Sequence, residues 1–304
     1  MAANKRWMTI ATPTPCGWQL ATSTPVGDVV TLLDRLRAQA NGAPVALGVD
    51  FPIGLPHAYA ALHVTEPDFP TFLRALATRP EFFSVGATLA DVTPRQPFYP
   101  ARGLRGMTRA SLAAALLLED VAGLSRRCDR ATSSRPAGAP LFWTLGANQT
   151  GKAAIAAWRD LLIPALAGSH PPRLWPFEGD FRALLTPGAV AIAETYPADA
   201  LRQLGLSLRG SKRRQSDRAA LTIPLLNTMA QLDVTPTPAM ATLIQTGFGA
   251  DAAGEDRFDS TIGVLCVIAV LAGQRPDSIP DDPALRQWEG WVLGQKEEKE
   301  AVLF

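Results

Sequence analysis

The sequence predicts an α/β protein in which a mixed sheet is flanked by helices. Two continuous apolar runs of strand length, Val45–Val49 and Ala189–Ala193, are each followed directly by an acid. Such runs are typical of strands that are buried on both faces. Much of the remaining chain has apolar residues at helical spacing, which favours helices on either side of the sheet.

The amino-terminal region is expected to form a hairpin followed by a helix. Residues 6–12 and 17–22 alternate in polarity and flank a Pro-Thr-Pro turn, as the arms of a hairpin do. Residues 28–40 carry apolar side chains at helical spacing, and Asn41 and Gly42 provide a stop signal. The first core strand, 45–49, follows this helix.

The middle of the chain is expected to be a helical, arginine-rich insert. Residues 57–172 contain helical patterns separated by proline and arginine turns, so residues 1–56 and 173–304 form the predicted α/β core. Between Val92 and Arg159 there are ten basic residues and three acids, an excess of seven positive charges. Two helices are expected in the second part of the core, over 197–204 and 259–272.

The amino-acid composition limits the classes of protein to which this chain can belong. The 304 residues are 47% hydrophobic with a formal net charge of +1, which fits a packed globular fold and excludes a disordered one. The three cysteines form no C-x-x-C pair, so free thiols are expected. No secretory signal is apparent, and the longest apolar run, 262–273, is too short for a membrane span. A cytoplasmic protein without a membrane anchor is therefore expected.

Three acidic clusters are the candidates for chemistry. Asp50 and Glu194 each end an apolar strand, where ligands gather in open α/β sheets, and Asp256 and Asp259 open the most apolar helix. Converging carboxylates repel one another unless a cation neutralises them, and oxygen ligands without His or Cys favour Mg²⁺ or Mn²⁺. The alternative is that these acids only cap turns and helices, which is the favoured interpretation for Asp256.

Basic segments supply candidates for contact with phosphate. The run Arg209–Arg218 contains Lys212 and Arg213, while the aromatic and basic stretch PFYPARGLRGMTR, residues 97–109, contains Arg102, Arg105 and Arg109. Aromatic rings interleaved with arginines suit nucleic acid, because rings stack on bases and guanidinium groups bind the backbone. Solvent-exposed basic loops without a ligand explain the same patterns.

A phosphate-loop pattern offers a different hypothesis. Residues 146–152, GANQTGK, match G-x-x-x-x-G-K and precede a predicted helix. However, the next residue is Ala153, which lacks the hydroxyl that binds Mg²⁺ in such loops. A helix preceded by glycine is the simpler interpretation.

Six segments together resemble domain-of-unknown-function family 429, whose members are predicted nucleases with an RNase H-like fold. They are GVDFPIGLP, LGANQTGK, LWPFEG, ETYPADAL, GEDRFDSTIG and EGWVLGQ. The resemblance implies that Asp50, Glu194 and Asp259 are metal ligands and that Lys212 lies near the phosphate. Chains of that family begin with an apolar strand that ends in Asp. No such strand precedes residues 2–11 here, so two interpretations stay open: either the first strand of the fold is missing, or the strand expected at residues 6–12 takes its place without the acid.

These observations lead to a functional hypothesis with two alternatives. The leading hypothesis is a Mg²⁺-dependent nuclease that cleaves phosphodiester bonds with clustered carboxylates, the basic insert covering the nucleic acid. The first alternative is a nucleic-acid-binding module without catalysis. The second is a nucleotide-binding enzyme that uses Lys152.

Overall fold

A parallel three-stranded sheet lies at the centre of the protein. The computed structural model describes residues 6–103, 106–146 and 150–298. The sheet has the strand order β5 (Val45–Val49), β7 (Val190–Glu194), β6 (Arg173–Leu174). Val45 pairs with Val190 and Val49 with Glu194, so β5 and β7 end together. The two predicted core strands are therefore confirmed as neighbours in one sheet.

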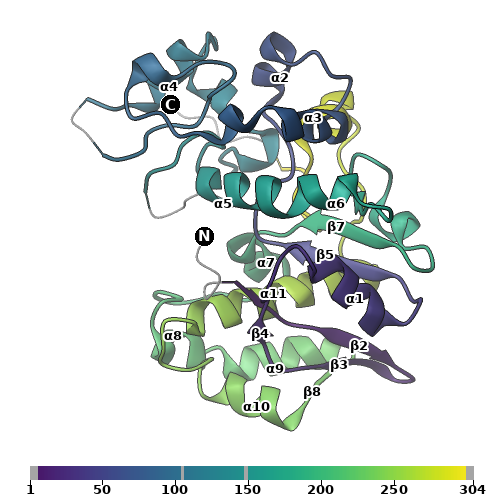
Figure 1. Ribbon diagram of the computed structural model, residues 1–304. Helices are drawn as coiled ribbons and strands as arrows, with labels where there is room; N and C mark the ends of the chain where they lie inside the picture. The colour runs from purple at the N-terminus through teal and green to yellow at the C-terminus, as the bar shows by residue number, and fades with distance from the viewer. Residues whose placement is uncertain (1–5, 104–105, 147–149, 299–304) are drawn as a thin grey trace.

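Helices cover both faces of this sheet (Figure 1). On one face, α5 (Thr150–Ala157) continues through a π-helical turn, Trp158–Leu162, into α6 (Ile163–Ala167). On the other face lies α11 (Gly254–Leu271), which is buried along most of its length. The α/β class and the helical flanks predicted from the sequence are confirmed.

A second small sheet carries the amino-terminal hairpin. β2 (Ala11–Thr14) pairs antiparallel with β3 (Gly17–Leu20), and β8 (Val234–Pro236) pairs parallel with β3. A separate ladder joins β1 (Trp7–Met8) to β4 (Thr24–Pro25). The predicted hairpin is confirmed, but its turn falls at residues 15–16, because Pro13 lies within the edge strand β2, where no amide donor is needed.

Eight shorter helices complete the regular α-helical structure of the described residues. They are α1 (Leu32–Ala40), α2 (His57–His63), α3 (Phe69–Ala75), α4 (Arg109–Ala115), α7 (Pro197–Gln203), α8 (Gln215–Ala219), α9 (Thr222–Gln231) and α10 (Pro238–Gln245). Single 3₁₀ turns occur at Leu76–Thr78, Pro80–Phe83, Leu89–Asp91, Val121–Leu124, Arg127–Asp129 and Phe181–Leu184, and a π turn at Leu285–Glu289. The predicted helix at 28–40 begins at Leu32 and ends, as expected, where Asn41 adopts a left-handed conformation.

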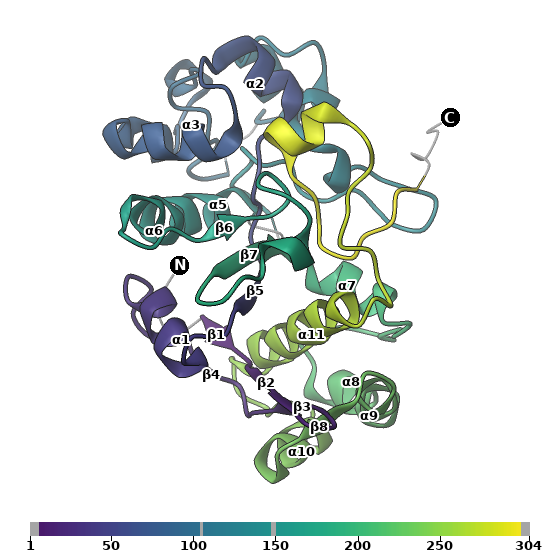
Figure 2. The same cartoon turned by 90° about the vertical axis from the view of Figure 1, so that its right-hand side faces the viewer.

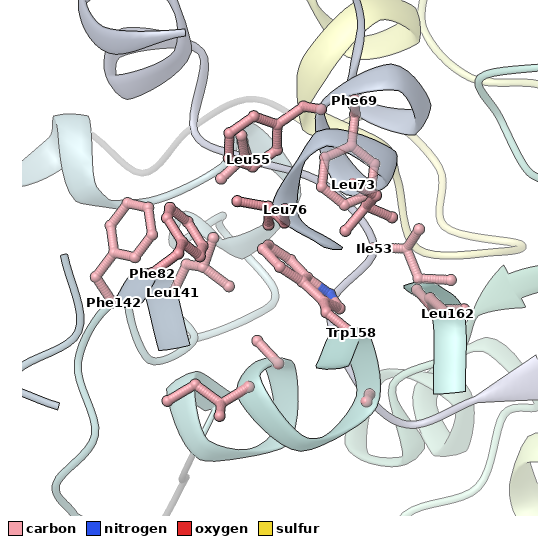
Figure 3. Packing of buried hydrophobic residues seen from close by; sticks show 14 of the residues in the cluster. Ile53, Leu55, Phe69, Leu73, Leu76, Phe82, Leu141, Phe142, Trp158 and Leu162 are labelled. Carbon is pink, nitrogen blue, oxygen red and sulfur yellow. The ribbon is translucent and has the colours of Figure 1, made fainter. Parts of the chain in front are cut away.

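The helical segment 57–172 packs directly on the sheet. Trp158 is fully buried among side chains such as Leu73 and Leu76, and its indole nitrogen donates to the carbonyl of Pro52 at 2.8 Å (Figure 3). The same hydrophobic cluster includes Val190 and Ile192 of β7. One core therefore joins this segment to the sheet.

Two details depart from the sequence-based expectations. All five residues of β5 are only half-buried, whereas all five of β7 are buried. β7 lies between two strands, while β5 has a strand neighbour on one side only among the residues that the structure describes. In addition, α11 begins at Gly254, five residues before the predicted start, so Asp256 lies in the first helical turn and is not the cap.

Within the described residues, no helix combines the length and the apolar character that are needed to cross a membrane.

Candidate functional site

Asp50, Asp259 and Lys212 form one charged cluster at the end of β5. Asp50 directly follows this strand, and Asp259 lies in the second turn of α11. The ammonium group of Lys212 donates to Asp259 Oδ2 at 2.5 Å and lies 3.5 Å from Glu255 Oε1. Residues that are far apart in the sequence thus meet where the sheet and α11 adjoin.

The pKa values of both aspartates are raised. Burial raises the pKa of Asp259 to about 6, although the ion pair with Lys212 opposes the shift. Enclosure by the protein raises the pKa of Asp50 to about 7, and the charge of Asp259 adds to the effect. The side chain of Asp50 is nevertheless exposed to a cavity, so water that enters the cavity partly screens its charge. Both carboxyl groups therefore keep a proton to a higher pH than an ordinary aspartate does.

A buried arginine fixes the segment that carries Lys212. Arg218 of α8 donates to the carbonyl of Lys212 at 2.5 Å and to the carbonyls of Gly247 and Gly249 at 2.9 and 2.7 Å. The amide of Ser211 donates to a carboxylate oxygen of Asp217 at 2.8 Å. These bonds tie the loop before α8 to the loop that leads into α11. The backbone of Lys212 is therefore held in position.

The predicted convergence of Glu194 with Asp50 is not observed. Side chains alternate between the two faces of a sheet, and the register pairs Glu194 with Val49. Glu194 therefore points to the same face as Ile192, toward the helical segment, while Asp50 lies one residue further on and faces α11. Asp50 and Glu194 end neighbouring strands but open onto different faces.

Arg126 binds both carboxylate oxygens of Glu194. Its guanidinium donates to Glu194 Oε2 at 2.6 Å and Oε1 at 2.7 Å, and to both oxygens of Asp129 at 2.8 and 3.1 Å. Only 1% of the Arg126 side chain and 7% of the Glu194 side chain are exposed. Burial alone would lower the pKa of Arg126, but the acidic groups around it raise the pKa well above its ordinary value. Glu194 is thus neutralised by an arginine.

Glu289 joins the same region from the carboxy-terminal part of the chain. Its carboxylate accepts from the amide of His57 at 3.0 Å and from the amide of Arg127 at 2.6 Å. Sequence reasoning overlooked Arg126, Asp129 and Glu289. The i,i+3 spacing of Arg126 and Asp129 was the one local signal, since Glu289 finds its partners 162 and 232 residues away.

The other predicted site residues lie outside the charged cluster or at its margin. The charge of Asp256 adds to the raised pKa of Asp50 and of Asp259. Arg213 is 72% exposed and lies 3.8 Å from Glu255, while Arg102 and Arg109 are exposed. Arg109 begins α4, which lies at the opposite end of the molecule from α8 (Figure 1). Arg105 lies outside the described residues, and Arg109 of α4 does not lie near Lys212, which is bound to Arg218 of α8.

The phosphate-loop motif lacks its expected setting. Residues 147–149 lie outside the described part of the chain, and the segment before them contributes an isolated bridge between Trp143 and Tyr99 where a strand is required. Gly151 packs against backbone, since an added Cβ would lie 2.8 Å from the carbonyl oxygen of Leu141. Lys152 is exposed to solvent. Gly151 thus allows the start of α5 to pack closely against the preceding segment.

A cavity of about 660 Å³, the central groove, opens beside the charged cluster. β5 and β2 line its two long sides, and Asp50, Asp256 and Asp259 lie along its wall. Figure 2 shows α1 and α11 on opposite sides of these strands. The groove gives water and solutes a route to Asp50.

The residues present fit a single hard cation better than a pair. Among the described residues, no group of three or more carboxylates, histidines or cysteines is arranged to hold a metal ion. Glu194, the third predicted ligand, has both oxygens bound to Arg126. However, Asp259 Oδ1 is buried without a hydrogen-bond partner among the described residues, and Asp50 faces the groove nearby. Two carboxylate groups thus remain that suit Mg²⁺ or Mn²⁺.

Comparison with family models, with curated proteins and with solved structures finds no match to this chain.

Proposed function

We propose that the protein hydrolyses phosphodiester bonds of nucleic acid in a Mg²⁺- or Mn²⁺-dependent reaction, at the Asp50, Asp259 and Lys212 cluster. The observation that carries this proposal is the meeting of two carboxylates and one ammonium group beside the central groove. A buried carboxylate with a purely structural role normally accepts hydrogen bonds at both oxygens, whereas Asp259 Oδ1 has no hydrogen-bond partner among the described residues. We also propose that the strands have an RNase H-like arrangement.

Asp50 and Asp259 would hold the cation, and Glu194 would not. A divalent ion supplies two kinds of chemistry at such a site: it lowers the pKa of bound water and stabilises negative charge on phosphate oxygens. A bound cation would explain why acidic and basic groups occur together here, because the cation and the ammonium group of Lys212 would together neutralise the carboxylates that repel each other.

The protein groups supply the remaining steps. Asp50, as a ligand, would hold the cation in its ionised form, and the cation would lower the pKa of Asp50 below the value of about 7 that the carboxyl group has without it. Lys212 is 35% exposed, so its ammonium group can reach a phosphate oxygen at the groove while its backbone remains fixed by Arg218. Arg213, at 72% exposure, adds positive charge on the solvent side.

A cleavage assay tests the proposal directly. Single- and double-stranded DNA and RNA are incubated with the protein in Mg²⁺, in Mn²⁺ and in EDTA. Cleavage that requires the cation, and that Asp50→Asn and Asp259→Asn each abolish, supports the proposal. Asp34→Asn, on the exposed surface of α1, is the matched control and keeps full activity.

Two outcomes distinguish the alternatives. Tight, salt-dependent binding of nucleic acid without cleavage in any cation favours the binding module. Cleavage that survives both substitutions in the cluster rejects the proposed site.

A further inference from the structure

A second cavity, also of about 660 Å³, lies between the loop 125–135 and the carboxy-terminal segment. Figure 2 shows this segment, in yellow, on the side of the molecule away from α1, and the second cavity shares no lining residue with the central groove. Its lining includes three arginines, Arg127, Arg130 and Arg135, together with Glu297 and Glu298. We call this cavity the tail pocket.

Arg135 brings a buried positive charge to the wall of the tail pocket. Only 6% of the residue is exposed. With its amide oriented so that the oxygen faces Arg135, the side chain of Gln295 accepts from both terminal guanidinium nitrogens at 2.8 Å, and the carbonyl of Arg130 accepts at 3.1 Å. These acceptors are neutral, and among the residues that the structure describes no carboxylate forms an ion pair with Arg135. A buried charge that is bound by neutral groups favours an anion nearby.

Two hydroxyl groups close to Arg135 converge on one oxygen atom. Ser134 Oγ donates to Glu298 Oε2 at 2.6 Å, and Thr132 Oγ1 donates to the same atom at 2.8 Å. These two hydrogen bonds lower the pKa of Glu298, and the charge of Arg135 lowers it further. This part of the wall therefore stabilises a negatively charged oxygen.

Arg127 provides a second position for an anion. Its guanidinium donates to Asp282 Oδ2 at 3.1 Å and also to Glu297 Oε1. Glu297 and Glu298 are consecutive, so one short stretch of the chain places a carboxylate at each of the two positions.

The two glutamates are held weakly, whereas the groups that bind them are fixed. Glu297 and Glu298 are both exposed to solvent, and exposed ion pairs contribute little to stability. Arg135 is buried, and two backbone hydrogen bonds close the turn that carries the hydroxyls: the amide of Thr132 donates to the carbonyl of Arg135 at 2.8 Å, and the reverse bond measures 3.4 Å. The binding groups would therefore stay in place when the carboxylates leave.

We propose that the tail pocket binds a small molecule with two or more phosphate groups, in competition with Glu297 and Glu298. A phosphate group carries more acceptor oxygens than a carboxylate, so it can bind the hydroxyls of Thr132 and Ser134 and a guanidinium group together. Two phosphate groups would match the two positions that the glutamates occupy. This site lies apart from the charged cluster and does not depend on hydrolysis there.

Calorimetric titration with tripolyphosphate tests this proposal. EDTA is present, so that neither the probe nor the charged cluster binds a divalent cation. The double variant Glu297→Ala with Glu298→Ala should bind the probe at least about threefold more tightly than the unsubstituted protein, because no carboxylate then has to be displaced. Asp34→Asn with Glu81→Gln removes the same charge from exposed positions elsewhere and should leave the affinity unchanged.

A second pair of variants locates the phosphate position. Thr132→Val with Ser134→Ala removes the two hydroxyl donors and should weaken binding at least about tenfold. Ser133→Ala removes the exposed hydroxyl between them and should leave the affinity unchanged. Circular dichroism checks that all variants remain folded. Titration with ATP identifies the source of the phosphates: tighter binding of ATP than of tripolyphosphate assigns the pocket to nucleotides, and weaker binding assigns it to free polyphosphate.

Four results overturn the proposal. The first is the absence of saturable binding to the Glu297→Ala, Glu298→Ala variant. The second is an equal gain in affinity for the charge control, which would mean that only overall charge matters. The third is binding that Lys212→Met abolishes, or that loss of the Thr132 and Ser134 hydroxyls does not weaken, since the probe then lies elsewhere. The fourth is tighter binding of malonate than of tripolyphosphate, which assigns the pocket to carboxylates.

Discussion

Arg126 and Glu194 form a buried, two-pronged ion pair that joins the helical segment to the end of β7. Both side chains are almost fully removed from solvent, so each charge depends on the other for compensation. The amide of Ile53 also donates to Glu194 Oε2 at 2.8 Å, which connects the pair to the loop after β5. The acid that sequence patterns assign to catalysis therefore organises the junction of three segments.

Removal of Arg126 should be strongly destabilising. Arg126→Met leaves Glu194 and Asp129 without their counter-charge, and we expect the unfolding free energy to fall by about 3–5 kcal/mol. The double variant Arg126→Met with Glu194→Leu should lose less than Arg126→Met alone, because no charge on Glu194 then remains buried. Urea denaturation of the two single variants and the double variant measures this coupling. Strict additivity of the two single effects contradicts the interpretation.

The contact between the loop after β5 and the turn at 289–290 depends on glycine. Gly290 has φ +66°, and an added Cβ would lie 2.2 Å from the carbonyl oxygen of Ile53. Gly290→Ala must move one backbone away from the other, so its cost should exceed the roughly 1 kcal/mol that a left-handed conformation imposes on an L-residue. Thermal unfolding should show a clearly lower Tm.

Gly188→Ala is the control for that prediction. Gly188 has φ +75°, close to that of Gly290, but an added Cβ would meet nothing within 4 Å. Its loss of stability should therefore reflect backbone strain alone. Equal effects at the two positions would mean that the close approach to Ile53 contributes nothing.

Local patterns were sufficient to predict several elements of this fold. The apolar runs of β5 and β7, the stop at Asn41 and the buried helix α11 each depend on neighbours in sequence, and each was found at or near its predicted position. The site was harder to predict. Asp50 and Glu194 follow similar apolar runs, but a one-residue offset relative to the strand register sends them to opposite faces, and that register is a tertiary property.

Which charged residues form pairs in the folded protein also could not be predicted from the sequence. Arg126 was one of ten basic residues in a charged segment, and only the acid three residues later, Asp129, distinguishes it locally from Arg102, which is exposed. The pair of Lys212 with Asp259 spans 47 residues. Composition indicates that charges are present, but only packing decides which of them are buried together.

The raised pKa of Asp259 predicts a particular dependence of stability on pH. The pKa of Asp259 is about 6 in the folded protein and 3.8 in an unfolded chain, so the folded state binds the proton more tightly. Stability should therefore fall as the pH rises from about 4 to 6, by at most about 3 kcal/mol from this group, and then level off. The raised pKa of Asp50 extends the fall toward pH 7, less steeply because water reaches Asp50 through the groove.

Asp259→Asn should remove this part of the dependence. Relative to the unsubstituted protein, the variant should gain stability between pH 4 and 7 in urea denaturation, because the unfavourable ionisation of Asp259 in the folded state is removed. Only the change with pH is compared, so any pH-independent effect of the substitution cancels. Asp277→Asn is the control of opposite sign, because the Arg182 side chain lowers the pKa of Asp277. Its substitution should remove stability that is present at pH 7 and absent at low pH. Parallel profiles for the two variants would contradict the assignment.

Metal binding separates the roles of Asp50 and Glu194. If Asp50 and Asp259 hold the cation, Asp50→Asn should weaken Mn²⁺ binding at least about tenfold in calorimetric titration, a loss of about 1.4 kcal/mol or more. Glu194→Gln should leave the Mn²⁺ affinity within about twofold, or about 0.4 kcal/mol, while lowering the unfolding free energy through its effect on Arg126. Because affinity and stability are measured separately, a folding defect cannot be mistaken for a missing ligand. Equal losses of Mn²⁺ affinity in the two variants would restore Glu194 as a ligand and require Arg126 to release it when the cation binds.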